Sequence, residues 1–173
     1  MGDRGRDPPD GVEQRHVAPM ARHHALPVGL VVLSLAMAAG LVGLAGREET
    51  LRAVAAGVRL DWHGPAVIRS GEFLEMRITV DTRDRIDRPV LEVAATLWED
   101  FTINTLIPAP VEEGSLDGAF RFEFAEMPAG SRLLIKVDAQ INPDILGGNA
   151  GMVTLYDGEQ ALVSLPVEIE VLP

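Results

Sequence analysis

His63 is the residue whose type most directly suggests chemistry, because it is the only histidine after residue 24. A histidine with a neighbouring carboxylate such as Asp61 can act as a general base. No serine lies in a nucleophile elbow, however, and no second catalytic group is indicated, so a polar residue at a strand end is the simpler interpretation. Because the part of the chain after residue 24 has one histidine and the whole sequence has no cysteine, histidine-rich and thiolate metal sites are excluded there. The sequence therefore predicts no catalytic residue, no metal site and no cofactor.

Carboxylates are more numerous than histidines, and several stand close together. Calcium requires about six to eight oxygen ligands from converging loops, which the loops at one end of a sandwich can supply. The first acidic group is interleaved with Arg83, Arg85 and Arg88, which neutralise it and compete with a cation. We therefore expect ordinary solvated turns at all of these groups, which are Asp81/Asp84/Asp87, Glu99-Asp100, Glu112-Glu113 with Asp117, and Asn142-Pro143-Asp144.

Trp98 is the strongest candidate for a binding residue. The preceding run places Leu91, Val93, Ala95 and Leu97 on one strand face, so Trp98 falls on the other face or just beyond the strand. An exposed tryptophan at a strand end is a typical interface anchor. The alternative is that 101–107 folds back and covers it. The predicted partner surface consists of Trp98, Phe101, Ile103, Leu106 and Ile107, and it ends at Pro108-Ala109-Pro110.

Composition limits the classes of partner. The 173 residues allow one domain of ordinary size. Because Lys and Arg number 15 against 26 Asp and Glu, the formal charge is -11, and nucleic acid is an improbable partner for the folded part.

A charge-free segment divides the chain. Residues 25–46 comprise 22 consecutive residues without a charge, and a helix of that length reaches roughly 33 Å, enough for a bilayer core of about 30 Å. We therefore predict a transmembrane helix over 25–46, which makes membrane lipid a partner of the anchor. The alternative is a cleaved signal peptide, since Ala36-Met37-Ala38 has the small-x-small pattern of a cleavage site. Residues 1–24 are predicted to be a disordered cytoplasmic tail.

Strand periodicity dominates the rest. Residues 47–57 carry helix-forming residues and are predicted to be a helical or flexible linker. Residues 58–173 then alternate apolar and polar residues in several short runs, clearest in 74–80 and 133–141, and Asp157-Gly158 is typical of a hairpin turn. The predicted fold is all-β, an antiparallel sandwich of seven to nine strands preceded by one transmembrane helix. A small closed barrel remains an alternative.

The runs GPAVIRSGEFLEMRITVDT and MPAGSRLLIKVDAQ carry a resemblance. With their turns and alternating strands, they resemble bacterial Ig-like domains of the fibronectin type III sort, over about residues 58–172. The resemblance implies an Ig-like β-sandwich with a binding or spacer role, no catalysis and no specific ligand residues. The cysteine pair and corner tyrosine of true immunoglobulin domains are missing.

The function expected from the sequence is therefore that of a single-pass protein of the inner membrane. Its C-terminal domain is expected in the periplasm or outside the cell, as a non-catalytic interaction or accessory module for a membrane or envelope protein. The alternative is an envelope carbohydrate-binding protein, anchored or secreted after signal cleavage, that binds sugar through its loops and Trp98.

Overall fold

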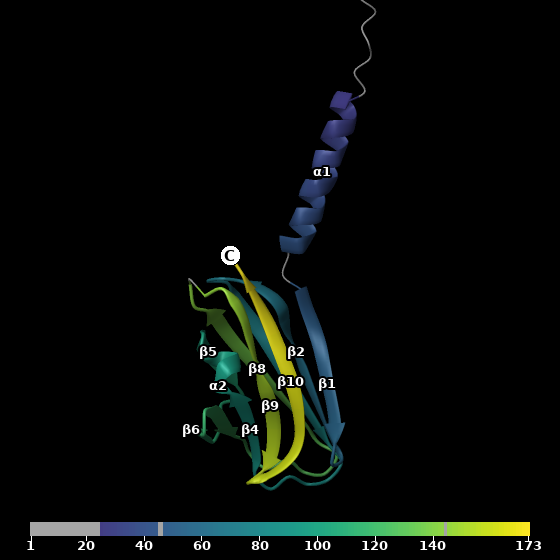
Figure 1. Cartoon of the computed structure of the whole chain (residues 1–173). Helices are drawn as coiled ribbons and strands as arrows, with labels where there is room; N and C mark the ends of the chain where they lie inside the picture. Colours follow the sequence, from purple (N-terminus) through teal and green to yellow (C-terminus); the bar gives the residue numbers. More distant parts are fainter. Residues whose placement is uncertain (1–24, 45–46, 144) are drawn as a thin grey trace, which may run out of the picture. The chain divides into compact units, whose positions relative to one another are not determined.

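The structure, a computed structural model, describes residues 25–44, 47–143 and 145–173 (Figure 1). The chain divides into two units, one up to Leu44 and one from Ala45 onward. The tail predicted over 1–24 lies outside the described residues, as do positions 45 and 46 of the predicted transmembrane segment.

The described part of the first unit is the helix α1 (Ala25–Leu44), which has no charged residue. Pro27 stands in its first turn, where a missing N–H is harmless. Among the described residues, no helix combines the length and the apolar character that crossing a bilayer requires. The transmembrane helix predicted over 25–46 is therefore not shown by the structure.

The second unit is built from strands. Its elements in chain order are β1 (Arg47–Ala55), β2 (Val58–Arg69), β3 (Phe73–Thr82), β4 (Pro89–Ala94), α2 (Ala95–Trp98), β5 (Phe101–Ile107), β6 (Glu112–Leu116), β7 (Ala119–Glu123), β8 (Arg132–Ile141), β9 (Gly147–Asp157) and β10 (Gln160–Leu172). Hydrogen bonds connect the strands in the order β5-β8-β3-β2-β10-β9-β4-β7-β6, and β1 pairs with β2 off this path.

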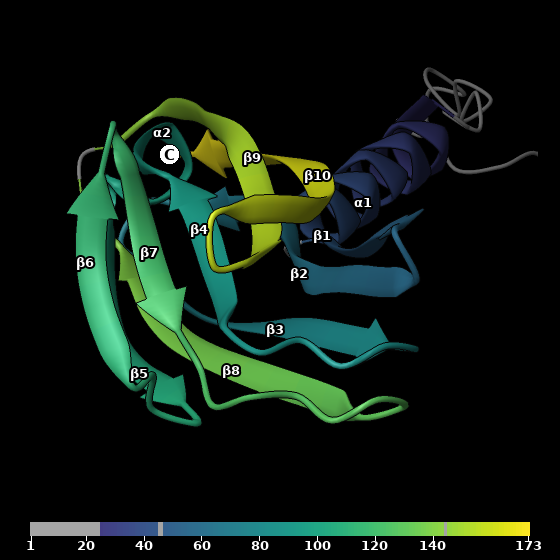
Figure 2. The same cartoon turned by 90° about the horizontal axis from the view of Figure 1, so that it is seen from below.

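This continuous sheet folds over into two layers. Seen from below, β2, β3, β8 and β5 form one side and β10, β9, β4, β7 and β6 form the other, with the core between them (Figure 2). β5 and β6 end the path and do not pair with each other, so the sheet is not a closed barrel. The predicted β-sandwich is confirmed: the described residues of 58–173 form nine strands, within the predicted seven to nine, and β1 adds a tenth from the segment predicted as a linker.

β2 connects the two layers and explains the one parallel pair. Its first half, Val58 to His63, pairs antiparallel with β3, while 67–69 pairs parallel with β10. Pro65 stands between these two stretches, where it donates no ladder hydrogen bond. The prediction of a purely antiparallel sandwich is wrong at this junction.

The core follows the predicted alternation. Met76, Ile78 and Val80 of β3 have no exposed surface, and Phe122 and Phe124 are buried while Phe120 is half-buried against the core. β8 and β10 contribute their own alternate residues, which are Ile135, Val137, Ala139, Ile141, Val163, Leu165, Val167, Ile169 and Val171. Burying an aliphatic side chain of this size contributes about 1.5–3 kcal/mol, so these rows hold the layers together.

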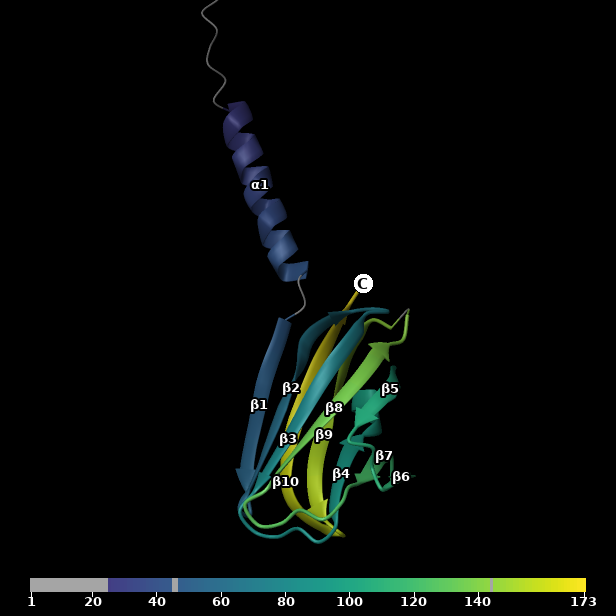
Figure 3. The same ribbon diagram turned by 180° about the vertical axis from the view of Figure 1, so that it is seen from behind.

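The helical or flexible linker predicted over 47–57 is wrong. Residues 47–55 form β1, and the whole length of β1 pairs antiparallel with β2. The two strands lie side by side in Figure 3. Leu51 and Ala53 pack against the core. Ala56 and Gly57 have φ values of 48° and 75° and make the two-residue hairpin turn. A paired edge and two core contacts outweigh a helix propensity of a few tenths of a kcal/mol per residue.

Candidate functional site

The predicted partner surface is not a continuous exposed patch. Trp98 is 2% exposed and Phe101 is 7% exposed, so both belong to the core. Ile103 and Leu106 are half-buried against the core, and only Ile107 is exposed. The strand predicted through residue 97 ends at Ala94, and the helical turn α2 rotates Trp98 inward. Of the two possibilities that the sequence left open, an exposed or a covered Trp98, the structure shows the covered one, so Trp98 cannot anchor the predicted surface.

Trp98 instead packs within an aromatic group. Its ring centroid lies 6.5 Å from that of Trp62 and 5.8 Å from that of Phe122, both in tilted arrangements. Such pairs contribute beyond their buried area. The Trp98 Nε1–H is buried without a hydrogen-bond partner. Trp98 therefore stabilises the fold through the packing of its ring and not through a hydrogen bond.

His63 lies on the outer face of the β1–β2 hairpin. Thr50 Oγ1 is 2.9 Å from its Nδ1, and Glu48 Oε2 is 3.3 Å from its Nε2. A hydroxyl, an imidazole and a carboxylate in a row have the types of a nucleophilic triad. Thr50 and His63 are direct cross-strand partners with exposed surroundings, and nothing there excludes water. The arrangement is accounted for by ordinary cross-strand pairing.

Carboxylates form no cation site in the described part of the chain. No group of three or more His, Cys, Asp or Glu side chains there converges as metal ligands. Asp87 pairs with Arg85, and Asp81 belongs to an arginine network. Asp144, predicted in a turn group, lies outside the described residues.

The arginine network crosses four strands on the outer face of the layer that contains β2, β3, β8 and β5. Arg52 of β1 donates to both oxygens of Asp61 at 2.6 and 3.1 Å. Arg59 lies between Asp61 and Asp81, and Arg132 of β8 donates to both Asp81 oxygens at 2.6 and 3.2 Å. These alternating charges connect β1, β2, β3 and β8 side by side.

Asp81 is the most strongly engaged carboxylate of this network. The hydrogen bond from Arg132 is the largest effect and lowers its pKa; partial burial opposes this, and the hydrogen bond from Arg59 adds a smaller lowering, so that the net direction is down. A lowered pKa in the folded state means that the stabilisation is complete above the ordinary value of about 3.9 and is lost as the pH falls through the folded value.

Asp81→Asn is expected to reduce the free energy of unfolding by about 1 kcal/mol at neutral pH, because the pairs are partly exposed. The difference from the wild type is expected to shrink below pH 4 and to vanish in strong acid. Urea unfolding across this pH range measures it, and a difference that is constant with pH would contradict the assignment.

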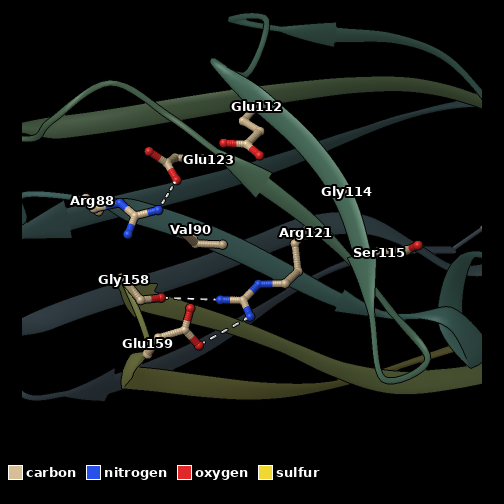
Figure 4. A pocket seen from close by; sticks show the side chains of 9 residues that line it. All are labelled: Arg88, Val90, Glu112, Gly114, Ser115, Arg121, Glu123, Gly158 and Glu159. Carbon is tan, nitrogen blue, oxygen red and sulfur yellow. Dashed lines mark hydrogen bonds and ion pairs between the residues drawn. The ribbon is translucent and has the colours of Figure 1, made fainter.

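A shallow hollow of about 180 Å3 lies on the outer face of the layer that contains β10, β9, β4, β7 and β6 (Figure 4). Strands β4, β6 and β7 and the β9–β10 turn contribute its walls. Two arginines and three glutamates dominate them, so carboxylates exceed guanidinium groups by one. The lining residues are Arg88, Val90, Glu112, Gly114, Ser115, Arg121, Glu123, Gly158 and Glu159.

Arg121 is fixed at one side of the hollow. Its guanidinium lies 5.3 Å from the Tyr156 ring centroid, a cation–π contact, and donates to the Gly158 carbonyl at 3.3 Å. Tyr156 donates its hydroxyl to Glu92 at 3.1 Å, and burial, followed by that hydrogen bond, raises the pKa of Tyr156. Arg121 also lies 3.6 Å from Glu159. The Arg121 guanidinium is thus held in place by the Tyr156 ring, the Gly158 carbonyl and the Glu159 carboxylate.

Arg88 is fixed at the opposite side. It donates to Glu123 at 2.8 Å, and that hydrogen bond lowers the pKa of Glu123. Its backbone N–H donates to Asp157, and its carbonyl accepts from the Gly158 N–H, so the β9–β10 turn is attached to the start of β4. The side chain of Glu112, in contrast, has no ion pair or hydrogen bond within the described part of the chain, although its charge helps to raise the pKa of Arg88.

Sequence reasoning missed this hollow. Its lining comes from positions 88 to 159, and neither Arg88 nor Arg121 stands in a motif. The Asp157-Gly158 turn was predicted, and the structure places it at the rim of the hollow. Which side chains lie next to this turn depends on the register of the strands, which the sequence does not reveal.

Comparison with known proteins gives no family. No family model matches the chain, and no curated protein matches it. The solution structure of CaCohA2 from Clostridium acetobutylicum is similar at 13% identity, covering 68% of this chain and 92% of the other, with a TM-score of 0.46. The crystal structure of the C-terminal domain of wzt is similar at 12% identity, covering 74% and 81%, with a TM-score of 0.41.

A third similarity covers a smaller share of its counterpart. The Pseudomonas fluorescens alkylpurine DNA glycosylase AlkC, bound to DNA containing an abasic site analog, is 20% identical over 66% of this chain and 31% of its own, with a TM-score of 0.34. The β-sandwich fold of this chain stands on its own strand order and core.

Proposed function

We propose that this chain is a non-catalytic interaction protein and that the hollow between Arg88 and Arg121 receives a polar segment of a partner protein. The observation that carries the proposal is that both guanidinium groups are fixed by neighbouring strands while the hollow stays open. Groups held in place before binding lose little conformational entropy when a partner arrives.

The charges of the hollow specify the chemistry of that segment. With one carboxylate in excess and Glu112 unpaired among the described residues, a lysine or arginine side chain of the partner is the best complement. Hydroxyl-bearing residues next to it can use the Gly158 carbonyl and the Glu159 carboxylate. The Ig-like resemblance of residues 58–172, with its binding or spacer role, is consistent with this function.

A matched pair of variants on β6 tests the proposal. Glu112 lines the hollow, whereas Glu113 is the next residue of the strand and points to the other face. A photo-crosslinker at Gly114, which shares the face of Glu112 and where an added side chain meets open space, identifies the partner in native membranes, and the partner is then purified for titration. Glu112→Gln is expected to weaken binding about tenfold, the effect of losing one charged hydrogen bond, and Glu113→Gln is expected to leave it unchanged.

Equal affinities of the two variants would contradict the proposed site. Hydrolytic turnover by the purified chain that is lost in His63→Ala would contradict the non-catalytic role.

Envelope carbohydrate is the second candidate ligand. The hollow offers guanidinium donors and carboxylate acceptors side by side, which suits the hydroxyl groups of a sugar. Trp98 has no part in it, because its ring is buried. A glycan array read with the wild type and with Glu112→Gln separates the candidates, since sugar binding that weakens in this variant would favour carbohydrate over a protein segment.

We further infer that the domain is held at the inner membrane, with its C-terminal unit in the periplasm or outside the cell. The support is the sequence of 25–46, with its 22 residues free of charge. A periplasm-specific reporter fused after Pro173 is expected to be active, and activity of a cytoplasm-specific reporter would contradict this location.

A further inference from the structure

Strand β1 has one hydrogen-bonding edge that no described strand occupies. It pairs only with β2 among the described strands, in a hairpin closed by Ala55 and Val58. In an antiparallel hairpin with a two-residue turn, bonded and non-bonded pairs alternate from the turn outward. The backbones of 49, 51, 53 and 55 therefore bond to β2, and those of 48, 50, 52 and 54 point away from it.

The other two strands at the margins of the sheet are protected. β5 has a bulge between Ile103 and Thr105, and β6 has only five residues, with Glu112 and Glu113 at its start. Bulges, short length and charges are the usual means of preventing strand addition. β1 also carries charges, at Arg47, Glu48, Glu49 and Arg52, but it has nine residues and no proline, and its register is regular from Glu48 to Ala55. It is the least protected of the three edges.

A second hollow lies beside this edge. It has a volume of about 580 Å3 and is bounded by Glu49 and Leu51 of β1, with the remaining walls from β9 and β10. Met152, which is 43% exposed, and Pro166 give it an apolar surface, while Glu49 and Glu168 make it acidic. The lining is completed by Ala150, Gly151 and Val167.

We propose that the free edge of β1 accepts an extended segment of a partner protein as an additional strand. Main-chain hydrogen bonds to 48, 50, 52 and 54 supply the affinity that β-strand addition uses. Alternate apolar side chains of the segment fill the hollow against Met152 and Pro166, and a lysine or arginine of the segment faces Glu49 or Glu168. This edge is separate from the hollow at Arg88 and Arg121, so either site can fail its test without the other.

Charge distinguishes a partner from a second copy of this chain. A second β1 strand would bring two arginines together with its two glutamates, so it adds no net positive charge to a surface that already holds Glu49 and Glu168. A basic segment from another protein has the complementary charge.

The test uses the full-length chain and a probe peptide, acetyl-Lys-Val-Thr-Val-Thr-Val-Lys-amide. Hydrogen exchange read residue by residue is expected to show protection of the Thr50 and Arg52 amides when the probe is added. Thr50→Pro removes one outward N–H while leaving the bonds to β2 in place, and it is expected to weaken probe binding about tenfold or more.

Thr50→Val is the matched control, because it keeps the N–H and removes only the hydroxyl near His63. It is expected to bind the probe as the wild type does. If Thr50→Pro fails to fold, hydrogen exchange on the wild type still shows whether the probe binds along the free edge of β1.

The proposal is overturned if Thr50→Pro binds as well as Thr50→Val, if protection appears away from β1, or if millimolar probe does not bind. A concentration-dependent dimer that Thr50→Pro abolishes would assign the edge to a second copy of this chain and would equally overturn it.

Discussion

Trp98→Ala is expected to lower the free energy of unfolding by about 3–5 kcal/mol, the range for removing a large aromatic side chain from a core. Trp98 is 2% exposed and lies between the rings of Trp62 and Phe122. Because domains of this size are stable by only about 5–15 kcal/mol, this loss removes a large part of the total. Urea denaturation followed by far-UV circular dichroism measures it, since tryptophan fluorescence is itself changed by the substitution.

Trp98→Phe is the control that separates ring packing from the indole N–H. It keeps an aromatic ring beside Phe122 and removes the Nε1–H that has no partner, so the cost of lost volume is partly offset. We expect a loss well below that of Trp98→Ala. A loss under about 1 kcal/mol for Trp98→Ala, the range of surface substitutions, would mean that Trp98 faces solvent.

Most of the sandwich could be predicted from alternation, because a strand with one buried face records that face in every second residue. β3 and β8 are the clearest cases, with Met76, Ile78, Ile135 and Val137 all inward. β1 could not be predicted in this way. All of its side chains are exposed or half-buried, so its state depends on the edge of β2, which its own residues do not encode.

The candidate site was beyond sequence reasoning for a related reason. Arg121 meets Tyr156 and Gly158 because β7, β4 and β9 are neighbours in a particular register. A one-residue shift would turn Arg121 to the opposite face. The residue types alone, an arginine in a strand and a tyrosine far along the chain, gave no reason to join them.

The same dependence on neighbours explains why α2 was taken for strand. Ala95 to Trp98 continues an apolar alternation, but Ala95 donates its N–H to Gly118 and the Glu99 N–H bonds back to the Ala95 carbonyl, closing a single helical turn. This turn lies on β9, and Thr96 donates its hydroxyl to the Ala150 carbonyl at 2.7 Å. Space for it exists because the next residue of β9 is Gly151.

Gly151→Ala is therefore expected to be the second most damaging substitution, with a loss of about 1–3 kcal/mol, typical of overpacking. A methyl group at this position would lie 2.7 Å from Ala94 Cβ and 3.0 Å from Leu97 Cβ. Both atoms are attached directly to backbone, so neither can rotate away, and α2 must move outward and take Trp98 with it. The unfolding midpoint in urea and the near-UV signal of the tryptophans are both expected to fall.

Gly148→Ala is the matched control on the same strand, because its added methyl group would meet only the Ile169 carbonyl at 3.5 Å, an ordinary contact. Adding Ala94→Gly to Gly151→Ala removes the closest clash and is expected to restore part of the lost stability, which neighbouring residues allow through non-additivity. If Gly148→Ala destabilised as much as Gly151→Ala, the loss would come from general strand effects of glycine replacement. In that case, close packing of α2 on β9 would not be what holds Trp98 in the core.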